Sequence, residues 1–193
     1  NLTSLTPANF ILGFGKIDGR DVIVGGEDFT VKGGSPNAAG LRKSVYTEDL
    51  AVKHKFPLVR LHEGGGGSVA GPSKEKKGYG GDPVFARSRF KSVAQTLKEV
   101  PVVSAALGPV AGLPASRFVG SHFRIMVKDN AQILVAGPAV VSRAFGKDFT
   151  KEELGGSDVH KKNGVTDNIA ESEEDAFNQI KKFLSFFPAN IYE

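Results

Sequence analysis

The stretch that decides the fold runs Val100-Pro101-Val102-Val103-Ser104-Ala105-Ala106-Leu107 and continues as Gly108-Pro109-Val110-Ala111-Gly112. Its first part is an apolar run of strand length, which predicts a β-strand. Its second part predicts a tight glycine turn from this strand into a helix, and glycine in such a turn lets the backbone approach another group closely. A strand followed by a glycine turn and a helix is typical of α/β domains with crossover connections.

A second stretch has the same form. Pro57–Leu61 predicts a short strand that leads into Glu63-Gly64-Gly65-Gly66-Gly67-Ser68. Such a turn frees consecutive backbone N–H groups and, together with a helix dipole, directs them at one spot, which stabilises an oxyanion or a phosphate. Tight packing of strand against helix is the alternative explanation for one turn. Two such turns in one small domain favour a site built from backbone.

The N-terminal part predicts paired strands. Asp18-Gly19 lies between two apolar runs, and Asp-Gly is a strong signal for a hairpin turn. Glu27–Lys32 is expected to continue as a third extended piece. Ser35-Pro36 predicts a helix start, with serine as the N-cap and proline at the first helical position. The other expected elements are a helix to about Lys55, a helix over Phe85–Glu99, strands at Phe123–Val127 and Gln132–Val135, and a short helix at Val140–Ala144.

The most distinct helix is expected near the C-terminal end. Ser172 is a suitable N-cap, and the three acidic residues after it suit the positive end of the helix dipole. Pro188 is expected to stop the helix. Apolar residues recur at helical spacing, and we expect them to be buried together as one face. These residues are Phe177, Ile180, Phe183, Leu184 and Phe187.

Composition limits the possible classes. The chain has 193 residues with a formal net charge of +4, and 24% of the residues are charged, which is typical of one globular domain. The absence of cysteine excludes a disulfide scaffold, a thiol nucleophile and a thiolate metal site. It suits a reducing compartment, either the cytoplasm or the mitochondrial matrix. No apolar run approaches the ~20 residues of a membrane-spanning helix, and Asn1–Asn9 shows no secretory signal, so no membrane is expected as a partner.

Several common site motifs are absent. Gly13-Phe14-Gly15 with Gly19 resembles a dinucleotide fingerprint, but this turn leads to a strand and not to a helix. There is no Walker A loop. The four histidines are scattered, which predicts no metal site, and no serine occurs in Gly-x-Ser-x-Gly. The serines that lie near glycine are interpreted as caps and turns: Ser35, Ser68 and Ser121.

A basic segment spans Lys74–Lys91, with six basic and two acidic residues. A solvated loop is one interpretation, and a binding site for a phosphorylated ligand is the other. Aromatic residues are not interleaved with these charges, so we expect no nucleic acid partner. The candidate phosphate-binding residues are Lys74, Lys76 and Lys77, with Lys43 on the preceding helix as a further candidate.

The order and spacing of these motifs resemble one family. From about Phe10 onward the chain is similar to the N-terminal half of the carboxyltransferase (β) subunit of biotin-dependent acyl-CoA carboxylases, of the propionyl-CoA and methylcrotonyl-CoA type. The residues that carry the resemblance are Gly19–Val22, Asp28–Ser35, Val100–Ser104, Gly108–Gly112, Ala136–Pro138, Lys151–His160 and Asn163–Val165.

The resemblance implies an α/β fold of the ClpP/crotonase type, a spiral of strand-strand-helix units. It implies a single carboxyltransferase N-domain over residues 1–193, without the family's C-domain or biotinyl site, and hence an enzyme that is incomplete on its own. The implied reaction moves a carboxyl group from carboxybiotin to the α-carbon of an acyl-CoA. The implied partners are a biotin carboxylase, a biotin carrier and further copies in a homo-oligomer, whose C-domain completes the site.

The resemblance also implies site residues. The backbone N–H groups of Gly112 and Leu113 match an oxyanion hole on the biotin side. The loop Gly64, Gly65, Gly66, Gly67 and Ser68 and the lysines above are assigned to the acyl-CoA from their backbone N–H groups and positive charge, and not from the resemblance. Two features depart from the family. In the turn, Leu113 replaces a second glycine and Pro114, which has no N–H, follows it. In the loop, Gly64–Ser68 replaces the family's Gly-Gly-Ala-Arg, so the acyl specificity is not carried over.

Two other interpretations remain open. One is another crotonase-fold acyl-CoA enzyme, either a decarboxylase or a hydratase. A hydratase needs a carboxylate over its substrate, and Glu63 is the acidic residue at a glycine turn. The other is a non-catalytic subunit that binds acyl-CoA or has a structural role, which Pro114 favours.

Overall fold

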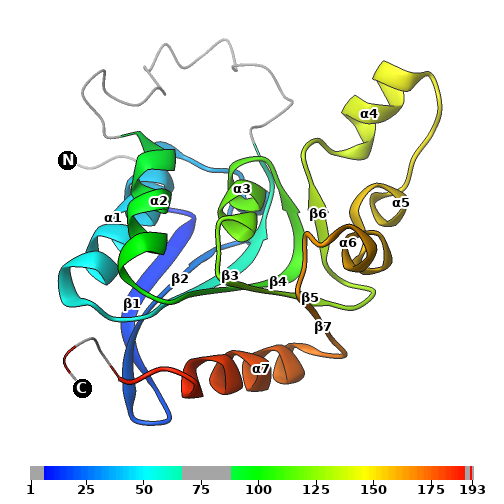
Figure 1. Cartoon of the computed structure of the whole chain (residues 1–193). Coiled ribbons are helices and arrows are strands. Elements are labelled where there is room, and N and C mark those ends of the chain that lie inside the picture. Colours follow the sequence, from blue (N-terminus) through cyan, green and yellow to red (C-terminus); the bar gives the residue numbers. More distant parts are fainter. Residues whose placement is uncertain (1–6, 67–87, 190–191, 193) are drawn as a thin grey trace, which may run out of the picture.

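The computed structural model describes residues 7–66, 88–189 and 192. The described residues form a seven-stranded sheet with the order β1-β2-β3-β4-β5-β7, and β6 lies beside β4 off this path (Figure 1). The strands are β1 (Phe10–Ile17), β2 (Arg20–Glu27), β3 (Leu58–Gly64), β4 (Val102–Ala111), β5 (Phe123–Val127), β6 (Gln132–Leu134) and β7 (Asn168–Ala170). The helices are the short 3-10 turn η1 (Lys32–Gly34), α1 (Ala38–His54), α2 (Arg89–Glu99), α3 (Leu113–Val119), α4 (Pro138–Phe145), α5 (Lys151–Gly155), α6 (Ser157–Asn163) and α7 (Glu173–Ser185).

The hairpin of β1 and β2 is the antiparallel part of the sheet. Asp18 and Gly19 form its turn with φ of 49° and 81°, as a two-residue hairpin turn requires. The pairings β2–β3, β3–β4, β4–β5, β4–β6 and β5–β7 are parallel. The α/β class and the strand in the stretch after Pro101 are therefore confirmed. The strand-strand-helix unit recurs as β1-β2-α1 and β5-β6-α4.

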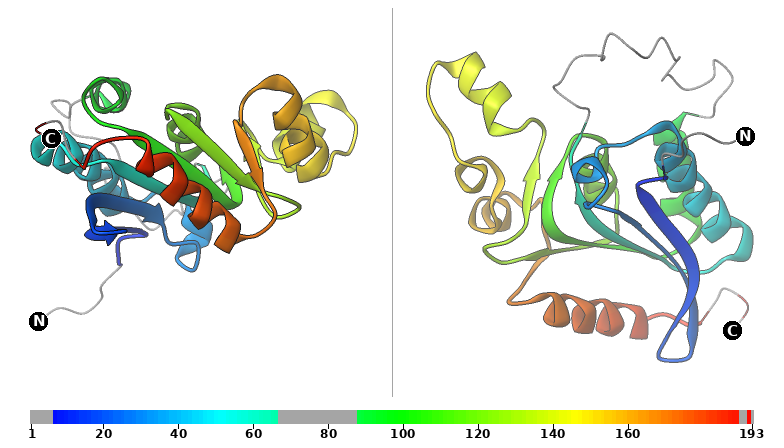
Figure 2. Two further views of the ribbon diagram at one scale, coloured as in Figure 1. Left: turned by 60° about the horizontal axis from the view of Figure 1, so that its bottom comes forward. Right: turned by 180° about the vertical axis from the view of Figure 1, so that it is seen from behind.

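Helices cover both faces of this sheet (Figures 1 and 2). Ile23, Leu58 and Val102 are in register and form the core on the side of α1 and α2. Their chain neighbours point to the opposite face, because side chains alternate along a strand. This second core includes Val103, and α7 closes it.

Two expectations about local structure were wrong. The third extended piece at Glu27–Lys32 does not form, because β2 ends at Glu27 and the chain turns through η1. The N-cap of α1 is Asn37 and not Ser35: the Asn37 side chain accepts the N–H of Gly40 at 2.7 Å. Ser35 instead remains extended and donates its backbone N–H to Lys32.

The C-terminal helix has the predicted N-cap, with Ser172 accepting from the N–H of Asp175. The predicted buried face was only partly correct. Ile180 and Leu184 are buried, whereas Phe177 is 38% exposed and Phe187, which lies beyond the end of the helix, is 37% exposed. Ala176 lies in the buried row instead, so the apolar stripe is narrower than the aromatic residues suggest.

Candidate functional site

Glycine backbones from separate parts of the chain meet at one end of the central strands. The N–H of Gly65, just after β3, donates to the carbonyl of Gly33 at 2.8 Å. A Cβ atom on Gly34 would lie 2.5 Å from the Cα of Gly64, which is shorter than any real contact. The loop after β3 can therefore pack on η1 only because these positions lack side chains.

The same loop also touches the end of β4. A Cβ on Gly66 would lie 3.2 Å from the carbonyl oxygen of Ala111 and 3.3 Å from the Cα of Gly112. The two glycine stretches that the sequence singled out are thus brought together by their backbones. Gly64, Gly65 and Gly66 belong to this cluster, whereas Gly67 and Ser68 lie outside the described residues.

The turn at the end of β4 is shorter than the sequence predicted. The strand continues through Pro109 to Ala111, so the turn consists of Gly112 alone, which is the N-cap of α3. Gly112 has φ 67° and ψ −125°, a conformation that glycine adopts at little cost and that residues with a Cβ avoid. Pro114 follows in the first turn of α3, where a missing N–H leaves no helical bond unmade.

One of the two predicted oxyanion donors is already used. The N–H of Gly112 donates to the carbonyl of Leu134 on β6 at 3.0 Å, so as placed it cannot serve a ligand. The sequence assigned Gly112 as a donor to the ligand, but its acceptor in this structure lies on a strand that the local motif does not reveal. Leu113 is the first residue of α3, and its N–H has no acceptor within that helix.

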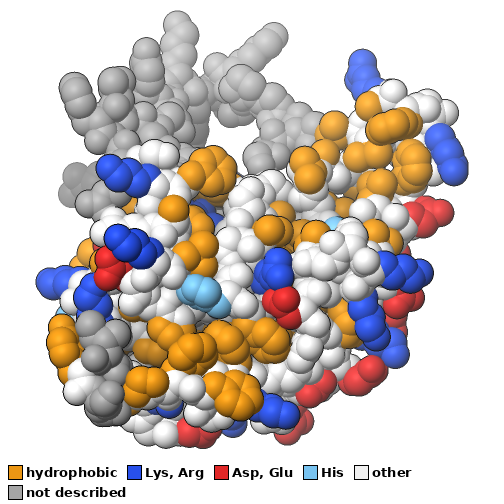
Figure 3. Space-filling model, viewed as in Figure 1, with side chains coloured by type: hydrophobic (Ala, Val, Ile, Leu, Met, Phe, Trp, Pro, Cys, Tyr) orange, Lys and Arg blue, Asp and Glu red, His pale blue; other side chains and the backbone are white. Residues whose placement is uncertain are grey.

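A cavity of about 480 Å³ opens beside this turn. Its walls are mostly apolar and come from α3, β6 and α6. They include Gly112, Ile133, Leu134, Val135 and the buried His160. Val135 is 97% exposed. Beyond β6, hydrophobic side chains also gather over α4 at the upper right of Figure 3. A polar backbone at the edge of an apolar hollow is the usual form of a small-molecule site.

A buried ionic cluster links α3 to α1 and β3. Oε1 of Glu48 on α1 accepts from Nη2 of Arg60 and from Nε of Arg117, both at 2.9 Å. All three side chains are at most 4% exposed. Burial lowers the pKa of Arg60 to about 10, against the opposing charge of Glu48. No local sequence pattern indicates this cluster, because its members come from α1, β3 and α3.

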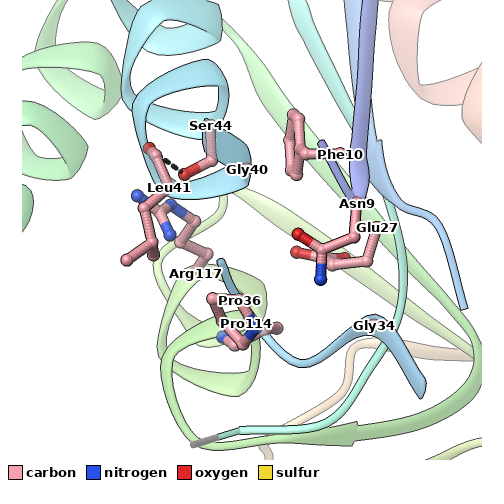
Figure 4. Close-up of a pocket in the computed structure, with 10 residues that line it drawn as sticks. All are labelled: Asn9, Phe10, Glu27, Gly34, Pro36, Gly40, Leu41, Ser44, Pro114 and Arg117. Carbon is pink, nitrogen blue, oxygen red and sulfur yellow. Dashed lines mark hydrogen bonds between the residues drawn. The ribbon is translucent and has the colours of Figure 1, made fainter. Parts of the chain in front are cut away.

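Oε2 of Glu48 and Nη2 of Arg117 have no hydrogen-bond partner among the described residues. Arg117 lines a space of about 10 Å³ that also touches Glu27, Gly34 and Pro114 (Figure 4). That volume suits one water molecule and not a substrate. We therefore interpret this space as part of the packing around the site and not as a place for substrate.

A second buried network resembles a hydrolase triad. Oε2 of Glu27 lies 3.0 Å from Nδ1 of His62, and Nε2 of His62 lies 3.4 Å from Oγ of Ser104. Burial raises the pKa of Glu27, but interactions with His62, a backbone hydrogen bond and the charge of Arg117 together lower it overall. Ser104 is 0% exposed and bonds Ser121 at 2.7 Å. A nucleophile must reach its substrate, so this network is structural.

The predicted acyl-CoA residues are only partly described. Lys74, Lys76 and Lys77 lie outside the described residues, as does Phe85 of the expected second helix. Lys43 is exposed on α1, next to Ser44, which lines the small space beneath Pro114.

Glu63, the carboxylate considered for a hydratase, does not line the cavity beside Gly112. A Cβ on Gly108 would lie 2.6 Å from Oε1 of Glu63, so this side chain occupies the space over β4 that Gly108 leaves open. Within residues 7–66 and 88–189, no group of three or more His, Asp or Glu side chains could hold a metal ion. No helix in the described part of the chain is long and apolar enough to cross a membrane.

Comparisons with known proteins identify relatives over nearly the whole chain. The methylmalonyl-CoA decarboxylase subunit alpha of Veillonella parvula is 34% identical over 184 residues, which are 95% of this chain and 35% of that protein. The propionyl-CoA carboxylase beta chain of Saccharopolyspora erythraea is 33% identical over 181 residues, 93% of this chain and 32% of that protein. The chain thus spans about a third of the length of these relatives.

A solved structure of transcarboxylase 12S, described as a hexamer with methylmalonyl-CoA and methylmalonic acid bound, is 28% identical. The match covers 99% of this chain and 36% of the transcarboxylase chain, with a TM-score of 0.78. The expected crotonase-like fold is thereby confirmed. The family model described as carboxyl transferase domain matches residues 5–193. The chain therefore belongs to the carboxyl transferase domain family.

Proposed function

We propose that this chain forms the biotin-side half of an active site that moves a carboxyl group between a biotin carrier and the α-carbon of an acyl-CoA. The observation that carries the proposal is the junction of Gly112 and Leu113, where a glycine turn meets a mostly apolar cavity of about 480 Å³. Among the described residues no group of three or more His, Asp or Glu side chains could hold a metal ion. The hydroxyl of Ser116, which lines the cavity, donates to the carbonyl of Gly112 at 3.3 Å and has no base beside it in a hydrogen bond among these residues. Positioning and oxyanion stabilisation by backbone fit such a site.

The two N–H groups at the turn have different roles in this proposal. The N–H of Leu113 is the donor that we assign to the ligand's oxygen, where a carbonyl or urea oxygen gains negative charge. The N–H of Gly112 is used to fix the turn to β6. The apolar walls exclude water and so strengthen the hydrogen bond between the Leu113 N–H and the ligand's oxygen.

The cavity suits the ring system of biotin, which combines an apolar body with a polar urea group. When bound, biotin supplies or accepts the carboxyl group. Gly112, Leu134 and Val135 would line its place at the cavity. Pro114 removes the third amide of the turn, so the proposed hole depends on Leu113 and on groups from outside this chain.

We assign the acyl-CoA to the glycine loop and the basic residues. Gly64 and Gly65 pack against η1, Gly66 places its backbone next to Gly112, and the sequence continues through Gly67 and Ser68. Lys43, Lys74, Lys76 and Lys77 are the proposed cations for the CoA phosphates. A C-domain, from the same polypeptide or from a neighbouring subunit of a homo-oligomer, would complete the site. A biotin carboxylase and a biotin carrier are the proposed partners.

A decarboxylase is the second candidate, because the methylmalonyl-CoA decarboxylase subunit alpha covers 95% of this chain at 34% identity. Both candidates use the same site in opposite directions. The direction then depends on the partner that loads or unloads biotin.

The test uses the full-length protein in its native assembly. Transfer of a labelled carboxyl group between the biotin carrier and a series of acyl-CoA thioesters should be measured in both directions. ATP-dependent loading of biotin in the purified assembly would identify the carboxylase, and ATP-independent release of carbon dioxide would identify the decarboxylase. No transfer in either direction by the complete assembly would contradict both candidates and leave a non-catalytic subunit.

A further inference from the structure

Strand β6 has two consecutive carbonyl groups that point to opposite sides. The carbonyl of Leu134 faces β4 and accepts the N–H of Gly112 at 3.0 Å. The carbonyl of Ile133 faces away from β4 and lies 2.7 Å from Nε2 of His160 on α6. Both Ile133 and His160 are at least nine-tenths buried. One short strand therefore connects His160 directly to the turn at Gly112.

The hydrogen bonds of His160 fix which nitrogen carries the proton. A carbonyl oxygen can only accept, so Nε2 of His160 must donate to Ile133. Nδ1 lies 3.2 Å from the amide nitrogen of Asn163 and 3.4 Å from its amide oxygen, and that oxygen already accepts the N–H of Val165 at 3.1 Å. Asn163 therefore donates to Nδ1, and the ring is held in one tautomer that points its N–H at β6.

The elements that carry His160 are fitted closely to β6. A Cβ on Gly155 would lie 2.1 Å from the carbonyl oxygen of Ile133, so α5 can approach this strand only with glycine at that position. Gln132 of β6 also donates to Glu152 of α5 at 3.1 Å. With three residues, β6 has few bonds of its own to β4, and these side chains provide its outer support.

We propose that His160 is a positioning residue for carboxyl transfer. Its Nε2–H holds the carbonyl of Ile133, β6 thereby keeps the carbonyl of Leu134 on the N–H of Gly112, and this bond sets the orientation of the Gly112–Leu113 peptide. His160 also lines the cavity beside Gly112, but we assign it no contact with reacting atoms. The effect of His160 on turnover rests on the proposed function. Its effect on the conformation of the turn at Gly112 rests on the hydrogen bonds alone.

Two amide side chains give a matched test. In His160→Gln the amide nitrogen can occupy the place of Nε2, whereas in His160→Asn the side chain is too short to reach Ile133. His122→Leu is the control, because His122 accepts the N–H of Val102 at 3.1 Å, at the opposite end of β4. All variants are made in the full-length protein in its assembly.

Turnover and backbone hydrogen exchange should be measured together. We expect His160→Asn to lower kcat about tenfold to a hundredfold, as misplacement of a binding group does, with KM for the acyl-CoA changed less than about twofold. Amide exchange in the peptide spanning 110–119 should become about tenfold faster, while exchange in β2 and β3 stays unchanged. His160→Gln should restore most of both values, and His122→Leu should leave both near wild type.

Normal exchange at Gly112 in His160→Asn would overturn the inference, as would faster exchange throughout the sheet, which would show a general structural role. Equal kcat losses in His160→Gln and His160→Asn would overturn it as well. If the wild-type assembly transfers no carboxyl group, the proposed function fails, but the exchange measurement still decides whether His160 holds the turn.

Discussion

Gly66 and Gly112 lie with their backbones in contact: a Cβ atom on Gly112 would be 3.1 Å from the Cα of Gly66. This contact joins the loop after β3 to the first turn of α3. A Cβ atom at either position would force the opposite backbone to shift by a few tenths of an ångström. Gly112 also has φ 67°, so a side chain there would both crowd Gly66 and strain the backbone.

Gly112→Ala should therefore damage the site more than the fold. We expect turnover in the full assembly to fall about a hundredfold, since the added methyl shifts the turn that carries the Leu113 N–H. Gly137→Ala is the control, because Gly137 is also the N-cap of a helix, but has φ −71° and open space at its Cβ position. Activity in Gly112→Ala equal to that in Gly137→Ala would show that the turn takes no part in the reaction.

The buried carboxylate of Glu48 should be important for stability. Glu48→Gln leaves Arg60 and Arg117 buried without their counter-charge, and breaking a buried ion pair typically costs about 3–5 kcal/mol. Urea unfolding should show a loss of this size. Asp167→Asn is the comparison, because its ion pair with Arg124 is partly exposed and should contribute less than about 1 kcal/mol. Equal losses in the two variants would contradict the role assigned to burial.

Stability should depend on pH through His122. Burial lowers the pKa of His122 below its ordinary value of 6.5, and a hydrogen bond to the backbone of Leu97 offsets this in part. The unfolded chain then binds a proton that the folded chain resists, so the contribution is present above about pH 6.5 and is lost as the pH falls through the folded pKa. Thermal midpoints of wild type and His122→Leu, measured between pH 8 and pH 5, should converge on acidification. A constant difference would contradict this assignment.

The C-terminal helix offers a paired test of burial. Leu184 is 1% exposed, and Leu184→Ala should lower the free energy of unfolding by about 3 kcal/mol. Phe177 is 38% exposed, and Phe177→Ala should cost less than about 1 kcal/mol in the same assay. A larger effect at Phe177 would mean that this side chain is covered in the native assembly.

The proposed CoA site can be tested by charge reversal. Replacing Lys74, Lys76 and Lys77 together by Glu should weaken acyl-CoA binding at low salt, and the difference from wild type should shrink at high salt. Equilibrium binding at both ionic strengths measures this effect. Replacing Lys161, Lys181 and Lys182 together by Glu, all exposed on α6 and α7, is the charge-matched control for the general field. Unchanged affinity at low salt would return the basic segment to a solvated loop.

Much of the fold could be predicted from local sequence. The apolar run after Pro101 gave a strand, Asp18-Gly19 gave the hairpin, and Ser172 with three acidic residues gave the start of α7. Each of these depends on propensities and hydrogen bonds within a few residues, which a linear pattern contains. The order and spacing of the motifs also identified the family, because many of these motifs contain glycines that the backbone of the fold requires.

Other features depend on partners that are distant in the chain. Ser35-Pro36 looked like a helix start, but Asn37 has the side chain that reaches the free N–H of Gly40. The local pattern at the end of β4 offered two free amides, and only the folded sheet brings Leu134 to accept one of them.

The sequence by itself thus determined that a glycine turn follows a buried strand, since composition and spacing control local backbone conformation. The tertiary structure alone decided which N–H of that turn remains available. It also decided that Glu48, Arg60 and Arg117 meet beneath it. The physical reason is that hydrogen bonding and charge pairing depend on distance in space, and β6, α1 and α3 reach the turn only when the sheet has assembled.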